Sequence, residues 1–107
     1  MTKPTPPYYA VIFTNEKTDT LEGYGEMANQ MVELAAKQPG YLGFESISEG
    51  NKSISVSYWT DLESIKAWKQ VADHAMAQKM GREKWYKSYT TRIARVEREY
   101  SFETEQG

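Results

Sequence analysis

Residues 53–68 read SISVSYWTDLESIKAW, and the rest of the fold can be worked out from this stretch. In its first half Ile54, Val56 and Tyr58 alternate with serines, which is the period of a strand with one apolar face. Its second half opens with Thr-Asp-Leu-Glu at residues 60–63, the pattern of a helix N-terminal capping box. The stretch therefore predicts a strand that leads directly into an amphipathic helix.

The helix that begins there has an apolar arc at three- and four-residue spacing, formed by Leu62, Ile65, Trp68, Val71, Ala72 and Ala75. On a continuous helix His74 points away from this arc. The alternative is a break near Ala72, after which Asp73 caps a second helical piece that runs to about Lys84. Under both alternatives His74 lies outside the central core.

Upstream of this stretch the pattern predicts two more strands and a helix. Residues 41–48 are joined to residues 53–59 by a polar connection typical of a hairpin, and residues 8–14 are a short apolar run that suits a strand. Between these strands Asp19 and Glu22 have the spacing of a helix cap. Apolar residues then recur at helical spacing, which predicts a helix over about residues 20–38.

Downstream, residues 88–102 predict a fourth strand. Strand periodicity places Ala94 and Val96 on one of its faces and Tyr89 and Ile93 on the other. Residues 1–7 are expected to be a flexible lead, residues 8–102 the single domain and residues 103–107 an acidic tail.

The order β-α-β-β-α-β predicts an α+β, ferredoxin-like fold, in which two helices cover one face of a four-stranded antiparallel sheet. The sheet has more apolar surface than two helices can cover, through Tyr8, Ile12, Phe44, Tyr58, Val96, Tyr100 and Phe102. An open apolar face of this size is typical of an interface. We therefore expect a homodimer in which the two sheets pack face to face.

Composition narrows the classes of partner. The 107 residues are enough for one domain, and 13 lysines and arginines against 15 aspartates and glutamates give no electrostatic case for nucleic acid or an anionic membrane. No apolar run approaches the length of a membrane span, and the start of the chain lacks the apolar segment of a signal peptide. With no cysteine in the sequence, we predict a cytoplasmic protein.

Four segments together resemble one family: PGYLGFE at residues 39–45, SYWTDLESIKAW at residues 57–68, His74, and AQKMGREKWYKSY at residues 77–89. On these residues the chain is similar to the antibiotic biosynthesis monooxygenase (ABM) domain proteins of the dimeric α/β barrel superfamily, over about residues 8–102. The resemblance implies a dimer with a pocket in each subunit between sheet and helices. The family includes cofactor-independent oxygenases of polycyclic phenols, haem-degrading oxygenases and members of unknown activity.

Haem degradation is the less favoured activity. Trp68 matches the tryptophan that packs on the porphyrin in haem-degrading relatives. However, the position of their iron-ligating histidine falls at Gln78, and His74 comes too early for it. Their strand-one asparagine corresponds to a position near Val11, whereas Asn15 comes later.

The resemblance thus favours a cofactor-independent monooxygenase that oxidises a small aromatic or phenolic substrate with O2, without a metal. The cavity of such an enzyme must bind a planar phenol, deprotonate it and stabilise the oxyanion. Candidate catalytic residues are His74 as the base, Arg92 at the oxyanion, and Tyr89. Candidate substrate-binding residues are Trp59, Trp68, Arg82 and Tyr86.

Each candidate also has a structural explanation. Trp59 and Trp68 suit core packing, His74 suits a cap or the surface, and residues 85–86 suit the turn into the last strand. The alternative for the whole protein is a non-catalytic dimeric protein of the same fold that binds a small apolar ligand or is associated with stress. Whether the chain is an enzyme, and on which substrate, stays open at this point.

Overall fold

The structure, a computed structural model, describes residues 4–78 and 81–105, without the side chains of Gln78 and Arg82. Its elements are β1 (Tyr8–Lys17), α1 (Tyr24–Ala36), β2 (Tyr41–Glu49), β3 (Lys52–Trp59), α2 (Leu62–Gln78), α3 (Gly81–Trp85) and β4 (Tyr86–Val96). The predicted βαββαβ order is confirmed, with the short helix α3 added before the last strand.

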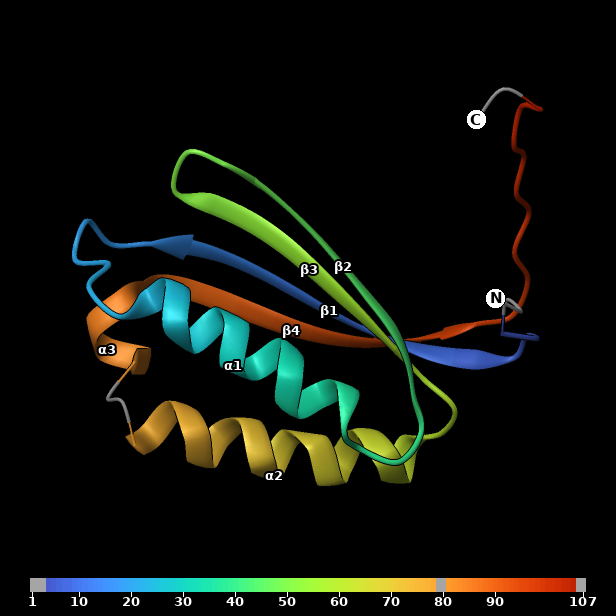
Figure 1. Cartoon of the computed structure of the whole chain (residues 1–107), viewed down its shortest axis with the longest axis horizontal. Helices are drawn as coiled ribbons and strands as arrows, with labels where there is room; N and C mark the ends of the chain where they lie inside the picture. Colours follow the sequence, from blue (N-terminus) through green and yellow to red (C-terminus); the bar gives the residue numbers. More distant parts are fainter. Residues whose placement is uncertain (1–3, 79–80, 106–107) are drawn as a thin grey trace.

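The four strands form one antiparallel sheet in the order β2-β3-β1-β4. Within the residues that the structure describes, all three helices lie on the same side of this sheet and none covers its other face (Figure 1). This is the ferredoxin-like α+β fold that the sequence predicts. We call the face without helices the open face.

Strand pairing assigns each residue to a face. Val11 of β1 is paired with Ser57 and Ile93, and it packs against the core that α1 and α2 form with β3. Its neighbour Ile12 is paired with Val56 and Arg92, on the open face. Because faces alternate along a strand, the serines of β3 point toward the helices and its isoleucine, valine and tyrosine point away from them.

The predicted composition of the open face is confirmed for Tyr8, Ile12, Tyr58 and Val96, which the pairing places together. It is wrong for Phe44, which is paired with Ser57 on the helix-covered face. The register between β2 and β3 shifts between Tyr41 and Gly43. Such an irregularity exchanges the two faces of the residues that follow it, so Phe44 turns inward.

Two apolar clusters attach the helices to the sheet. The first contains the buried residues Ala35, Trp59 and Ile65, and the Trp59 indole N–H donates to Ser57 Oγ over 2.8 Å. The second contains Met27, Ala75 and Trp85, and the Trp85 indole N–H donates to the carbonyl of Glu22 over 2.9 Å. Trp85 therefore fixes the turn from α3 into β4 against the start of α1.

The helix ends differ from their predicted positions. Helix α1 begins after Gly23, whose φ of 82° is left-handed, and no side chain caps it, so the predicted cap at Asp19 and Glu22 is wrong. Helix α2 is capped by Asp61, whose Oδ1 accepts from the backbone N–H of Ser64 over 2.8 Å; this bond is the main cause that lowers the pKa of Asp61. Helix α2 is continuous to Gln78, so of the two alternatives the continuous helix is confirmed and the break near Ala72 is not.

Strand β4 ends at Val96, so the predicted strand is wrong for residues 97–102, and Tyr100 and Phe102 lie outside the sheet. From there to residue 105 the chain has no regular structure and leaves the body of the domain (Figure 1). Glu99 attaches this segment to the sheet, because the Tyr8 hydroxyl donates to Glu99 Oε1 over 2.6 Å. This hydrogen bond is the main cause that raises the pKa of Tyr8 from 10.0 to about 12.

A pKa raised by folding gives this contact a defined pH range. The contribution of this hydrogen bond to the free energy of unfolding is complete below pH 10 and is lost as the pH rises toward 12, because ionised Tyr8 cannot donate to a carboxylate. Glu99→Gln removes the negative charge, so the pKa of Tyr8 is expected to fall toward its ordinary value. A ¹³C-tyrosine NMR titration measures it, with Glu97→Gln as a control that leaves the pKa unchanged. A Tyr8 pKa that stays near 12 in Glu99→Gln would contradict this assignment.

Candidate active site

A cavity of about 490 Å³ lies between the helix-covered face of the sheet and helices α1 and α2. This volume falls within the roughly 300–1,000 Å³ of small-molecule sites. Apolar side chains form the helical wall, among them Met27, Met31, Val32, Ile65, Trp68 and Met76. The cavity therefore suits an apolar molecule of small size.

The floor of the cavity is polar. Ser46 and Ser48 of β2, and Ser53, Ser55 and Ser57 of β3, all line it, and Ser55 Oγ donates to Ser46 Oγ over 3.2 Å. Small side chains at these positions leave space that larger residues would fill. The cavity thus exists because serines, not aliphatic residues, face the helices here.

Four aromatic residues surround the end of the cavity near α3. Ring centroids are 5.3 Å apart for Phe13 and Tyr89, 5.5 Å for Tyr86 and Tyr89, and 6.0 Å for Tyr24 and Tyr86. Burial is the main cause that raises the pKa of Tyr86 far above its ordinary value. Its phenol therefore stays neutral at physiological pH.

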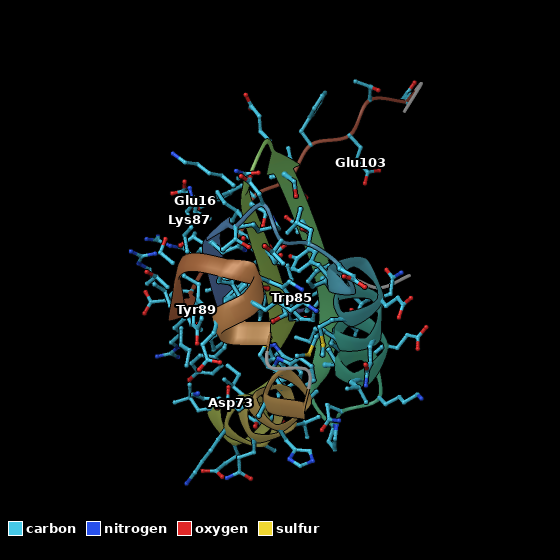
Figure 2. All side chains as sticks on the ribbon, turned by 90° about the vertical axis from the view of Figure 1, so that its left-hand side faces the viewer. Glu16, Asp73, Trp85, Lys87, Tyr89 and Glu103 are labelled. Carbon is cyan, nitrogen blue, oxygen red and sulfur yellow. The ribbon has the colours of Figure 1, made fainter. Side chains whose placement is uncertain are left out.

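A charged pair borders the cavity on α2. Lys69 Nζ donates to Asp73 Oδ2 over 2.7 Å, and both residues contribute to the lining. Asp73 and Tyr89 appear on the same flank in the view of Figure 2. Asp73 is the only carboxylate among the lining residues that the structure describes, so it is the group there that can accept a proton. The sequence pattern had suggested Asp73 only as a helix cap.

Three of the predicted site residues, Trp68, Tyr86 and Tyr89, line the cavity. Trp59 lies behind this wall: its side chain is fully buried and stacks on Trp68 with ring centroids 5.9 Å apart. The structural explanation of Trp59 therefore fits its position. The side chain of Arg82 lies outside the described residues.

The other two predicted residues do not line the cavity. His74 is exposed and borders a separate shallow hollow with Gln30 and Leu34 of α1. Arg92 lies on the open face, opposite Ile12. On the continuous helix, Asp73 and not His74 is in phase with the cavity wall.

Across residues 4–78 and 81–105, no group of three or more histidine or acidic side chains is arranged to hold a metal ion. Within the same residues no helix is long and apolar enough to cross a membrane. The cytoplasmic location stays a prediction.

A ferredoxin-like sheet, helices on one face and a cavity between them define an α+β protein whose cavity has the size of small-molecule sites. Comparison with known families makes this class specific. The chain belongs to the Antibiotic biosynthesis monooxygenase family, which matches residues 7–80. The resemblance seen in the sequence is thereby confirmed.

Individual relatives are similar to different extents. "Uncharacterized protein YqjZ" of Bacillus subtilis (strain 168) is 48% identical over 101 residues, which are 94% of this chain and 89% of that protein. "Jasmonate monooxygenase ABM" of Pyricularia oryzae is 29% identical over 82% of this chain and only 43% of that protein. The chain thus spans less than half of the fungal relative.

Solved structures show the same fold. A variant of SnoaB, a cofactor-independent oxygenase from Streptomyces nogalater, superposes with a TM-score of 0.72 over 88% of this chain and 97% of that one. The two sequences are 10% identical, so this likeness concerns the fold alone.

Proposed function

We propose that this chain is a cofactor-independent monooxygenase that oxidises a small aromatic or phenolic substrate with O2. The observation that carries the proposal is the cavity itself, in which aromatic walls, a serine floor and one carboxylate, Asp73, surround the same space. Polar groups that converge inside an apolar pocket are typical of catalytic sites. Membership of the monooxygenase family supports the same reaction class.

The reaction needs no external reductant. A phenol loses its hydroxyl proton, and the phenolate supplies electrons to O2. One oxygen atom enters the ring to give a quinone, and the other leaves as water with the hydroxyl hydrogen and the displaced ring hydrogen. The atoms balance as one phenol plus O2 giving one quinone plus water.

Residues of the cavity fit the steps of this reaction. Asp73 is the proposed base, in place of His74, because Asp73 borders the cavity and His74 does not. Trp68 and Tyr89 are the proposed stacking surfaces for a planar ring, each contact contributing about 0.5–1.5 kcal/mol. The serine hydroxyls and neutral Tyr86 are the proposed donors that orient polar groups of the substrate.

Oxygen uptake tests the proposal directly. Purified protein is assayed with naphthols and dihydroxynaphthalenes, and with jasmonate because a relative carries that name. Asp73→Asn is expected to lower kcat about 10²- to 10⁴-fold, the usual contribution of a general base. His74→Ala is the matched comparison and is expected to keep full activity. Loss of activity in His74→Ala alone would return the role of base to the histidine.

One observation favours the non-catalytic alternative. His74 and Arg92, the acid–base and oxyanion groups expected from the sequence, both lie outside the cavity of their subunit. A binding protein of this fold would take up an aromatic ligand and release it unchanged. Native mass spectrometry followed by analysis of the released ligand separates the two functions, because an oxidised product excludes simple binding.

We also propose that the open face forms a homodimer. Ile12, Val56 and Tyr58 share this face with Ile54, which is 47% exposed in the isolated subunit. The unstructured tail adds Tyr100 and Phe102, both almost fully exposed. Exposed apolar area of this kind is typical of an interface.

A charge at Ile54 tests the dimer. In a two-fold symmetric interface Ile54→Asp buries one unpaired carboxylate per subunit, so we expect the dimer to weaken by at least about tenfold. Leu62→Asp is the control, because Leu62 is 53% exposed but begins α2 on the other side of the sheet. Sedimentation equilibrium measures both variants. A wild-type protein that stays monomeric at micromolar concentration would contradict the proposal.

A further inference from the structure

Lys17, the last residue of β1, is a buried cation without a carboxylate partner. It is only 6% exposed, and neither of the two ion pairs in the described part of the chain includes it. Its Nζ donates to Ser53 Oγ over 3.1 Å and lies 5.3 Å from the centre of the Tyr24 ring. Buried lysines are normally paired with an anion, so this one requires an explanation.

The contact with Ser53 connects Lys17 to the cavity. An ammonium group can only donate, so Ser53 Oγ is the acceptor in this bond and its own hydrogen remains available. Ser53 lines the cavity and has no acceptor for that hydrogen within the described residues. A positive charge behind the oxygen makes the hydroxyl a stronger donor toward the cavity. This arrangement favours a ligand atom that carries negative charge.

Asn15 gives a second, independent indication. It is 7% exposed and is paired with Ser53 on one side and Tyr89 on the other, both of which line the cavity. Its Oδ1 is buried without a hydrogen-bond partner in residues 4–78 and 81–105. A buried acceptor left unpaired is costly, so this oxygen, flanked by two lining residues, indicates a ligand that carries a hydrogen-bond donor in addition to its acidic oxygen.

The surroundings define the rest of the ligand. Phe13, Tyr24, Tyr86 and Tyr89 enclose this end of the cavity with aromatic rings. Such walls suit a planar apolar body, and the only charge that Lys17 and Ser53 complement is negative. An aromatic molecule with an acidic oxygen meets both requirements.

We propose that Lys17 and Ser53 form an anion-binding end of the cavity, where the Ser53 hydroxyl donates to a carboxylate or phenolate oxygen of an aromatic ligand and Lys17 supplies the charge behind it. Lys17 is thus a positioning residue that acts through Ser53. The proposal deepens the proposed function, on which the identity of this ligand as a substrate rests. Binding itself does not depend on turnover.

Calorimetry with matched probes tests the site: 2-naphthoate as the anion, methyl 2-naphthoate as its neutral ester, and 2-naphthol as the phenol. Lys17→Met is expected to weaken binding of naphthoate about 10- to 100-fold, as a charge-assisted contact would. Binding of the ester is expected to change by about threefold or less. Lys87→Met is the control, since it removes the same charge from an exposed position at the same end of the sheet.

The two sources of the anion are separated by naphthol. If bound naphthol shows the absorption of its ionised form in the wild type but not in Lys17→Met, the site is assigned to phenolates. If Lys17→Met weakens only the binding of naphthoate, the site is assigned to carboxylates. Unchanged naphthoate binding in Lys17→Met, equal losses of naphthoate and ester, or a wild-type protein that binds neither would each overturn the proposal.

Ser53→Ala keeps the test valid if Lys17→Met does not fold. It leaves the lysine in place and removes the donor, so naphthoate is expected to bind about tenfold or more weakly. Unchanged binding in this variant contradicts the proposal. The binding measurements are made without oxygen, and oxygen uptake is assayed separately. If Lys17-dependent binding is found but no oxygen uptake follows, the proposed function fails and the anion-binding site stands.

Discussion

Trp59→Ala is expected to lower the free energy of unfolding by about 3–5 kcal/mol, the range for removing a fully buried tryptophan. The substitution leaves a void between Trp68 and Tyr41, whose rings lie 5.9 and 5.7 Å from that of Trp59. It also removes the donor to Ser57 Oγ. The total free energy of unfolding of a small domain is only about 5–15 kcal/mol, so this loss is a large fraction of the stability. Urea unfolding followed by circular dichroism measures it.

Trp68 provides the matched comparison, because it shares the stack but is only half-buried and faces the cavity. Trp68→Ala is expected to cost about 1–2 kcal/mol of stability and to weaken binding of an aromatic ligand about tenfold. In Trp59→Phe an aromatic ring is kept in the stack, while the indole donor and part of the ring volume are lost, so a smaller loss of stability than in Trp59→Ala is expected. If Trp68→Ala were as destabilising as Trp59→Ala, the division between a packing tryptophan and a ligand-facing one would be wrong.

Gly40→Ala is the second substitution for which we expect a large effect: it should lower the free energy of unfolding by about 2–4 kcal/mol. Gly40 has a φ of 85°, which is unfavourable for residues with a Cβ. A Cβ there would also collide with the side chain of Ser64 and lie 2.8 Å from Thr60 Oγ1. The carbonyl of Gly40 accepts from the backbone N–H of Thr60 over 2.9 Å, which joins the start of β2 to the end of β3. The chain therefore cannot move away to relieve the collision.

Gly50→Ala separates backbone strain from crowding. Gly50 also has a positive φ, 59°, but a Cβ there meets nothing within 4 Å. Its substitution is expected to cost only about 1 kcal/mol. Thermal unfolding of both variants gives the difference. Equal losses would mean that Ser64 and Thr60 move aside and that strain alone explains the effect at Gly40.

Periodicity was sufficient to predict the element order, and it also gave the correct faces for β1, β3 and β4. Alternation in β3 separates its serines from Ile54, Val56 and Tyr58, as the structure has it. The face of Phe44 could not be predicted, because it depends on a register shift that no local pattern reveals. The start of α1 was also missed. The loop before it is held by hydrogen bonds to distant segments, such as the one from Thr18 Oγ1 to the carbonyl of Lys84, and α1 begins beyond its predicted cap.

The sequence allowed three aromatic residues that line the cavity to be identified, but not its polar residues, and the functional role of all of them stays a prediction. Trp68, Tyr86 and Tyr89 were identified because large rings stand out in a small domain. The serine floor was missed because a serine that alternates with apolar residues usually faces water. Lys17 and Asn15 were missed because the predicted strand ended at Thr14, whereas β1 continues to Lys17 and carries both side chains to the covered face.

Different residues determine the stability of the fold and the shape of the cavity. The two tryptophan clusters contain the best buried apolar residues, while the floor consists of hydroxyls that contribute little apolar burial. Exchanging Ser46 or Ser55 for alanine, threonine or valine would enlarge or reduce the space in the cavity without changing a side chain of either cluster or its hydrogen bonds. Single substitutions in the floor are therefore expected to change which molecules fit the cavity, while the residues that stabilise the fold stay the same.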